Sequence, residues 1–349
     1  MITQRIDKED SVLGFFHEWL KKFAEKLDKL YVACLVKNGY DLPENVKVFS
    51  LGKEKGFSKI RQFFRLQKFL MKHLSDVDGI FIHMCSIYVL AIFPLAKIFR
   101  KKIILWHVHK SVGWKLKLAE KCADQILTAS PESCRLKNRK KIKVVGHGID
   151  TDFFKPLSLD VELGVSSGDF RIICPGRISP IKDQEILIKA VNILVNQKNI
   201  KDIAIKIIGA PIDEYEKEYA KKIEKLVQIL GLGERVSFFG AISHNRILEH
   251  YQNSDLMINL SHTGSIDKVV LEAMSSGCLV LTCNEAFYGI LDKRYLFKKK
   301  NPQDLAEKIL YFKKINLEAR KQITQHLREQ VIESHNLDNL IDKIILNFK

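Results

Sequence analysis

The sequence has little of several features that mark specialised protein classes. Only 8 of its 349 residues are proline and low-complexity stretches are absent, so a disordered chain is excluded. Its seven cysteines are odd in number, scattered and without a CxxC pair, so neither a disulfide framework nor a zinc ribbon is expected. The opening MITQRIDKEDSVLGFF lacks an apolar run, so we expect no secretory signal and a cytoplasmic protein.

Acidic residues are also fewer than basic ones. The chain contains 57 Lys and Arg but only 41 Asp and Glu, which gives a formal net charge of +16. Such an excess suits nucleic acid, an anionic membrane surface or phosphorylated substrates. The basic segment Lys53–Lys72 interleaves cations with apolar side chains, which favours a helix on the inner membrane face; a solvated surface is the alternative. No motif of stacking aromatics supports nucleic acid, so no such partner is expected.

Long apolar runs are rare, and one of them, Gly79–Ala96, is long enough that a membrane span has to be considered. Gly79–Ala96 carries no Asp, Glu, Lys or Arg, but it contains His83 and Pro94 and is shorter than the ~20 residues that a spanning helix needs. We interpret it as a buried strand, Ile80–His83, followed by a helix from about Ile87. A membrane span is the alternative interpretation.

The length predicts two domains, and the first 160 residues alternate apolar strands with helical patterns. This alternation is typical of an α/β fold with a doubly wound parallel sheet. The strands expected are Leu30–Leu35, Val46–Ser50, Gly79–His83, Ile103–His107, Gln125–Thr128 and Lys143–Val145, with helices at Gly14–Lys29, Ser58–Ser75, Tyr88–Arg100 and Trp114–Cys122.

A polar, turn-rich segment, His147–Pro156, and the stretch Leu157–Asp169 form the candidate linker. A second series follows it, with strands expected at Phe170–Cys174, Ile203–Ile208, Val236–Phe239, Leu256–Leu260 and Leu279–Thr282. We therefore predict domains at 1–160 and 161–330. We also predict a C-terminal helix at 331–349 that packs back toward the N-terminal domain.

Three loops in the second series follow strands, where doubly wound sheets bind their ligands. The first contains Arg177 and Lys182 after a Gly turn, which suits a diphosphate at a helix start. The second begins at Gly209, and the third is Thr263–Cys283, a polar loop, short helix and strand. In the third, Asp267 suits a helix start and Glu272 lies among apolar residues. We expect these loops to hold the phosphate and ribose of a nucleotide.

At this point the residues resemble a family. PGRISPIKDQEILIKA, IIGAPIDEYEKEYAKKIEKLVQILGLGERVSFFGAI and SDLMINLSHTGSIDKVVLEAMSSGCLVLT are similar to the C-terminal domain of glycosyltransferase family 4, of the group 1 type. The junction HGIDTDFFKP resembles the family's Asn-Gly-Val-Asp-x-x-x-Phe linker, with His147 in place of Asn. The resemblance covers most of residues 100–290 in order.

The resemblance implies a GT-B fold, with two Rossmann-like domains facing a central cleft, and a retaining, metal-independent transferase of sugars from nucleotide-sugar donors. The acceptor would be a polysaccharide, another glycan or a lipid-linked molecule. Arg177 and Lys182 would grip the donor diphosphate and Glu272 the ribose, while the backbone near Ile242 would contact the base. His109 would reach the donor sugar from the first domain. Gly209, Gly264, Ser265, Asp267 and Lys268 complete the implied donor site.

Two departures from the family pattern matter. The family's first glutamate, eight positions before Glu272, is Gly264 here, and Asp267 or loop amides near Ser265 are candidate replacements in this TGSIDKVVLEAM variant. The family's Gly-rich acceptor loop is also lacking. Only Gly14 lies near the expected place, with His83 as a second acceptor-side candidate.

Other interpretations stay open. His107 and His109 form an HxH pair that could bind metal, but no carboxylate partner is evident, so no metal or cofactor is expected. Lys268 could be a solvated helix residue. For the whole chain, the alternatives are an epimerase or hydrolase of nucleotide sugars, and a non-catalytic donor-binding subunit.

Overall fold

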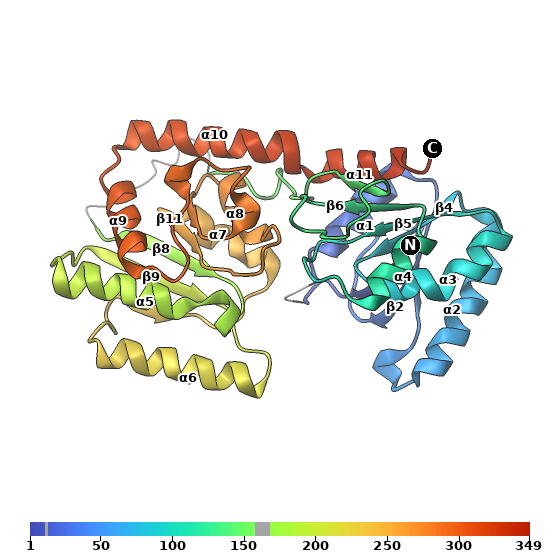
Figure 1. The fold of residues 1–349 in the computed structure, drawn as a ribbon, viewed down its shortest axis with the longest axis horizontal. Helices are drawn as coiled ribbons and strands as arrows, with labels where there is room; N and C mark the ends of the chain where they lie inside the picture. Colours follow the sequence, from blue (N-terminus) through green and yellow to red (C-terminus); the bar gives the residue numbers. More distant parts are fainter. Residues whose placement is uncertain (11–12, 158–167) are drawn as a thin grey trace. The chain divides into compact units, whose positions relative to one another are not determined.

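The computed structural model describes residues 1–10, 13–157 and 168–349, which form two compact units (Figure 1). Unit 1 comprises Met1–Gly148 and Asn336–Lys349, and unit 2 comprises Ile149–His335. The division lies earlier in the chain than the expected boundary at 160. Much of the expected linker Leu157–Asp169 falls outside the described residues.

Unit 1 is built on a seven-stranded sheet in the order β3-β2-β1-β4-β5-β6-β7, with every pair parallel. Its strands are β1 (Ile2–Ile6), β2 (Leu30–Lys37), β3 (Val46–Ser50), β4 (Gly79–His83), β5 (Lys102–Trp106), β6 (Gln125–Thr128) and β7 (Ile142–Val144). The α/β pattern of the sequence is thus confirmed for this unit, strand by strand from β2 onward.

Strand β1 is not predicted by the sequence pattern, which gives no strand before Leu30. Its residues, ITQRI, contain only two apolar side chains and so give no apolar run. Nevertheless β1 lies between β2 and β4, where Ile2 is opposite both Ala33 and Ile82. Position in the sheet, rather than local hydrophobicity, makes this segment a strand.

The helices of unit 1 form around this sheet. They are α1 (Phe16–Lys26), α2 (Lys59–His73), α3 (Ser86–Ile98), α4 (Trp114–Cys122) and α11 (Leu337–Leu346). Side chains of α2, α3 and α4 share one apolar core with the strands. Helix α11 lies beside α1, with Lys26 Nζ 2.6 Å from Asp342 Oδ1, so the end of the chain packs in unit 1. The run Gly79–Ala96 becomes β4 and α3, as expected from its Pro94 and His83.

Unit 2 contains a five-stranded parallel sheet in the order β10-β9-β8-β11-β12. Its strands are β8 (Phe170–Pro175), β9 (Ile203–Ile208), β10 (Val236–Phe238), β11 (Leu256–Asn259) and β12 (Leu279–Thr282), and its helices are α5 (Gln184–Asn192), α6 (Glu214–Ile229), α7 (Ile247–Gln252), α8 (Lys268–Ser275), α9 (Pro302–Lys313) and α10 (Leu317–His335). All five expected strands are therefore present.

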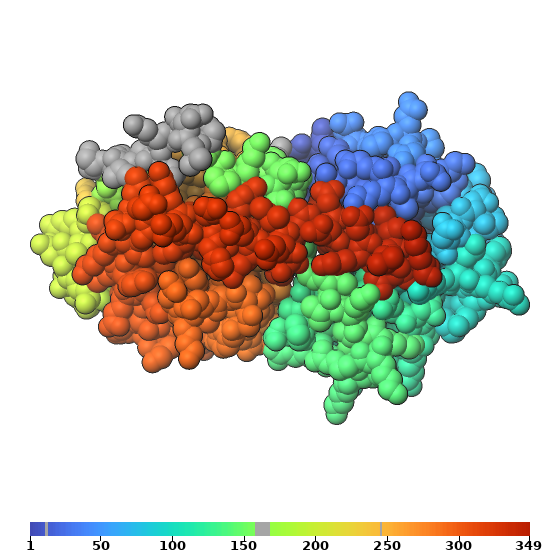
Figure 2. Space-filling view, turned by 90° about the horizontal axis from the view of Figure 1, so that it is seen from above, coloured from blue at the N-terminus to red at the C-terminus, as the bar shows by residue number. Residues whose placement is uncertain are grey.

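Two helical layers cover this sheet (Figure 1). Helix α5 packs with both α6 and α9, while α8 packs with α7 and α10. Figure 2 shows the exposed side of α10, in red, beside the orange part of unit 2. The carboxyl ends of the parallel strands share one edge, so the loops that follow them are neighbours.

The segment after Gly148 is anchored in unit 2, which explains the position of the boundary. Phe154 is fully buried, with its ring 5.3 Å from that of His244 and 6.2 Å from that of Tyr251. Its carbonyl accepts hydrogen bonds from Ser275 Oγ and Arg328 Nη1. His147, by contrast, is buried in unit 1 against Trp106.

Candidate functional site

The loops after β8, β9 and β10 touch one another at the carboxyl edge of the unit 2 sheet. Gly209 follows β9 with a φ of 145°, and a Cβ there would lie 2.0 Å from the carbonyl oxygen of Gly176. Its N–H donates to the carbonyl of Gly240, at 2.7 Å. Only glycine allows this close approach, so the expected strand-end glycine has a backbone reason. Ile242 is half-buried in the adjoining loop.

Asp267 is the centre of a polar network at this edge. Its carboxylate lies 2.7 Å from Lys182 Nζ and accepts hydrogen bonds from the side-chain amides of Asn259, at 3.2 Å, and Asn284, at 3.0 Å. Lys182 Nζ also donates to Ser261 Oγ, at 3.1 Å. The loops after β8, β11 and β12 are thus tied together by one carboxylate. Asp267 therefore forms an ion pair that holds the Lys182 side chain in place.

Arg177 is anchored in a different way. Its Nε lies 3.2 Å from Glu216 Oε1 on α6, and the other oxygen of Glu216 accepts the Ile212 N–H. Glu216 is buried, whereas the Arg177 side chain remains 42% exposed. The pair therefore leaves part of the guanidinium available to an anion while fixing its direction.

The loop before α8 contains the position where the family pattern has a glutamate. Gly264 stands there with a φ of 64°, a left-handed conformation that disfavours a side chain. The next residue, Ser265, is buried. Among the residues that the structure describes, its hydroxyl has no hydrogen-bond partner. A buried unsatisfied hydroxyl is costly, so this loop has an unused hydrogen-bonding group for a ligand.

Glu272, on α8, lies in a buried polar cluster. Its Oε1 is 3.0 Å from His244 Nε2, its Oε2 accepts a hydrogen bond from Tyr251 at 3.3 Å, and Lys268 Nζ is 3.8 Å away. Burial alone would raise the pKa of this carboxyl group. His244, Lys268 and Tyr251 outweigh that effect and hold the pKa of Glu272 below its usual value. Glu272 is therefore an ionised acceptor.

Lys268 is not a solvated surface lysine, which corrects that alternative. Its side chain is only 17% exposed. Desolvation lowers the pKa of Lys268 to about 8, although the carboxylates of Glu272 and Asp150 act in the opposite direction. The start of α8 thus places the Lys268 ammonium group, which loses its proton more readily than an ordinary lysine, close to the Glu272 carboxylate.

The histidine pair of the sequence lies in unit 1, just after β5. His109 is exposed, and its Nδ1 accepts a hydrogen bond from the Ser111 N–H at 3.1 Å. His107 is buried with its Nε2 3.0 Å from the His109 carbonyl oxygen, and desolvation lowers the pKa of His107 to about 4. His107 is thus a neutral packing residue. Nowhere in the three described ranges do three or more His, Cys, Asp or Glu side chains gather as metal ligands.

The two acceptor-side candidates are also in unit 1. His83 ends β4 and is buried, with its ring stacked on Phe16 at a centroid distance of 4.1 Å. Trp19 packs against the same imidazole. A Cβ on Gly14 would lie 2.4 Å from the Asp10 carbonyl oxygen, so this close backbone contact requires glycine at position 14. Both residues have packing reasons to be where they are.

Sequence reasoning missed Asn259, Asn284, His244 and Glu216. The two asparagines had a signal, because each is a polar residue at the carboxyl end of a buried strand, β11 or β12. His244 and Glu216 had none, because each meets its partner only through the tertiary fold.

The family model described as "Glycosyl transferases group 1" matches residues 158–330. Among curated proteins, the D-inositol 3-phosphate glycosyltransferase of Nocardia farcinica is 28% identical over 186 residues, which cover 51% of this chain and 41% of that protein. The protein of the same description from Geodermatophilus obscurus is 28% identical over 147 residues, or 41% of this chain and 32% of that one. The chain thus matches less than half the length of these relatives.

Solved structures extend the likeness to both units. Anabaena HepE, in complex with UDP and glucose, aligns with a TM-score of 0.75 at 18% identity over 99% of this chain and 97% of its own. Sucrose-phosphate synthase from Thermosynechococcus elongatus aligns with a TM-score of 0.74 at 16% identity over 99% and 98%. Such identities show the fold alone. Residues 158–330 thus match the group 1 glycosyl transferases, within a chain that has the two-unit GT-B fold.

Proposed function

We propose that the protein is a retaining glycosyltransferase that moves a hexose-type sugar from a nucleoside diphosphate sugar to a polysaccharide, other glycan or lipid-linked acceptor. One observation carries this proposal most directly. Lys182, held by Asp267, and Arg177, held by Glu216, are oriented cations at one sheet edge, within the segment that matches the group 1 family. Two positioned cations suit a diphosphate leaving group.

In this proposal each residue of the site has one task. Arg177 and Lys182 stabilise the negative charge that develops on the diphosphate when the bond to the sugar breaks. Glu272 accepts hydrogen bonds from the ribose hydroxyls, while the Ser265 hydroxyl faces a phosphate or the sugar. Gly209 and the backbone at Ile242 line the nucleotide, and His109 contributes from unit 1. The reaction then needs no metal ion.

The test is a thermal-shift screen with UDP-, GDP- and ADP-sugars, followed by assays for transfer. A donor that binds the folded protein raises its melting temperature. We expect one nucleotide class to do so and the new glycosidic bond to keep the anomeric configuration of the donor, read by proton NMR. Release of free sugar or an epimer would instead indicate the hydrolase or epimerase. Binding without turnover across many acceptors would indicate a donor-binding subunit.

An anionic membrane surface is part of the proposal, and α2 supports it. The helix contains no Asp or Glu, and it exposes Ile60 and Phe64 at 70% and 65%. Lys59, Lys68 and Lys72 are exposed on the same helix. Apolar side chains flanked by cations suit the headgroup region of anionic lipids. None of the helices in the described part of the chain is long and apolar enough to cross a membrane.

Liposome sedimentation tests this surface. We expect salt-sensitive binding to vesicles that contain phosphatidylglycerol and none to neutral vesicles. Replacing Phe63 and Phe64 with Ser should release the protein. Ile229→Ser, at a position on α6 that is about as exposed as Phe64, should not. Equal binding to charged and neutral vesicles, or no salt-sensitive binding at all, would exclude the anionic membrane surface from the proposal.

A further inference from the structure

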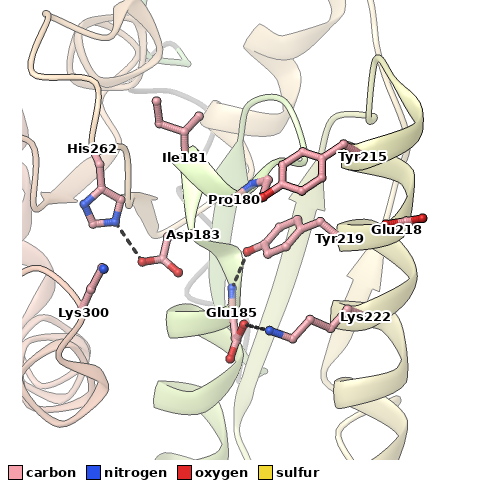
Figure 3. Close-up of a pocket in the computed structure, with 10 residues that line it drawn as sticks. All are labelled: Pro180, Ile181, Asp183, Glu185, Tyr215, Glu218, Tyr219, Lys222, His262 and Lys300. Atoms are coloured by element: carbon pink, nitrogen blue, oxygen red, sulfur yellow. Dashed lines mark hydrogen bonds and ion pairs between the residues drawn. The ribbon is translucent and has the colours of Figure 1, made fainter.

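A cavity of about 690 Å³ lies in unit 2 between α5 and α6, outside the network around Asp267 (Figure 3). Tyr215 and Tyr219 project from α6 on one side, and His262 and Lys300 stand on the other. Asp183 and Glu185 lie between them. The volume is within the range of small-molecule sites.

The lining of this cavity mixes apolar surface with both donors and acceptors of hydrogen bonds. Tyr215 is 68% exposed and Ile181 42% exposed, so a flat ring and an aliphatic side chain are available for contact. The carboxylates of Asp183, Glu185 and Glu218 accept hydrogen bonds, and Lys222 and Lys300 donate them. Acidic and basic side chains are thus nearly balanced in this lining, which suits a neutral ligand better than a phosphate or nucleotide.

The polar groups of the cavity are held in place before any ligand arrives. Asp183 has a φ of 47°, which is uncommon for a residue with a side chain, and its Oδ2 lies 2.9 Å from His262 Nε2. Glu185 lies 2.6 Å from Lys222 Nζ, and its N–H donates to the Tyr219 hydroxyl. Such preorganisation reduces the cost of binding.

The cavity and the candidate donor site use alternate residues of the same two segments. Lys182 points to Asp267, whereas its neighbours Ile181 and Asp183 line the cavity. Ser261 contacts Lys182, whereas His262, the next residue, contacts Asp183. The two sites therefore use different side chains of the same two segments.

We propose that this cavity is a second binding site, which takes a neutral saccharide. A pyranose has apolar C–H faces that pack on an aromatic ring, here Tyr215. Its hydroxyl groups both donate and accept, so they match an alternation of carboxylates and amines. This site goes beyond the proposed transfer reaction, because none of its residues has a task in donor binding.

Saturation-transfer NMR on the full chain tests the site directly. The probes are neutral di- to tetrasaccharides of glucose, galactose, mannose and N-acetylglucosamine. We expect transfer to C–H protons of at least one sugar class, and affinity about fivefold weaker in Tyr215→Ala. Asp183→Asn should weaken binding as well, since the amide is a poorer acceptor.

Two controls decide the outcome. Tyr311→Ala removes another exposed tyrosine, on α9 and outside the cavity, and should leave saccharide binding unchanged. Saturating UDP should leave it unchanged too, because the nucleotide occupies the other site. The proposal is overturned if no saccharide gives a signal, if UDP abolishes the signal, or if Tyr215→Ala binds as the wild type does.

Discussion

The strand ends around Asp267 in unit 2 and the end of β4 in unit 1 differ in their chemistry. In unit 2 they hold ion pairs and amides around Asp267, with Lys182, Asn259 and Asn284 as partners. In unit 1 the corresponding end of β4 holds His83 inside a stack of aromatic rings. The same sheet architecture thus supports a network of charged and amide groups at the unit 2 edge and a packed aromatic cluster at the end of β4 in unit 1.

The difference shows how structural and functional polarity can be separated. Asp255, at the amino end of β11, is fully used by the Arg171 backbone and side chain and by Arg320, so it joins elements. At the carboxyl end, Ser265 keeps an unused buried hydroxyl, and Arg177 keeps exposed surface. Groups with capacity left over are the ones that a ligand can use.

The largest effect should come from Lys182→Ala. If the unit 2 edge carries the chemistry, loss of this cation should reduce kcat by about 10²–10³-fold, the usual cost of removing a group that stabilises developing negative charge. Lys189→Ala is the matched control, because the Lys189 side chain on α5 is 47% exposed and lies outside the candidate donor site, and it should retain activity. Steady-state kinetics with the donor found in the thermal screen measures both. Equal turnover in the two variants would show that the unit 2 edge does not carry the chemistry through Lys182.

The complementary change in unit 1 is His83→Ala. Removing a buried ring from the stack with Phe16 and Trp19 should cost about 2–4 kcal/mol of unfolding free energy, through the cavity that it leaves. Nucleotide binding should be unaffected, since that site lies in unit 2. Urea unfolding and UDP titration measure the two quantities. A weakened affinity for UDP without loss of stability would show that His83 has a ligand role.

Asp267→Asn tests whether Asp267 acts on the donor through Lys182. The carboxylate lies 2.7 Å from Lys182, so it competes with a diphosphate for that cation. Its removal should tighten UDP binding several-fold, while kcat falls by about tenfold because the lysine loses its orientation. Calorimetry and kinetics on one preparation separate the two effects. If affinity and turnover fall together, Asp267 contacts the donor itself.

The fold of unit 2 could be predicted closely, because its strands are short apolar runs that end in Gly or polar residues. Strand β1 could not, because ITQRI becomes a strand only through its neighbours β2 and β4. The same limit applies to the site. Local pattern and family resemblance predicted Arg177, Lys182 and Glu272 as site residues. The partners of Arg177 and Glu272, which are Glu216 and His244, come from distant elements.

The structure gives a physical reason for the glycine at position 264. Gly264 stands where the family pattern has a glutamate, and its positive φ shows that the turn itself favours glycine. Asp267 had two candidate tasks in the sequence, namely to replace that carboxylate or to start a helix. The structure gives it another, which is to hold Lys182. Only a contact across the sheet edge could reveal this.

A pH-dependent effect is expected from Lys268, whose pKa is lowered to about 8 beside Glu272. The unfolded chain, in which lysine titrates near 10.4, binds more protons than the folded state above pH 8. The free energy of unfolding should therefore gain up to about 1.4 kcal/mol per pH unit from this group between pH 8 and 10. Lys268→Met lacks that gain, so its stability relative to the wild type should decline across this window. Urea unfolding of both proteins at several pH values measures the difference, and parallel pH profiles would show that Lys268 is solvated after all.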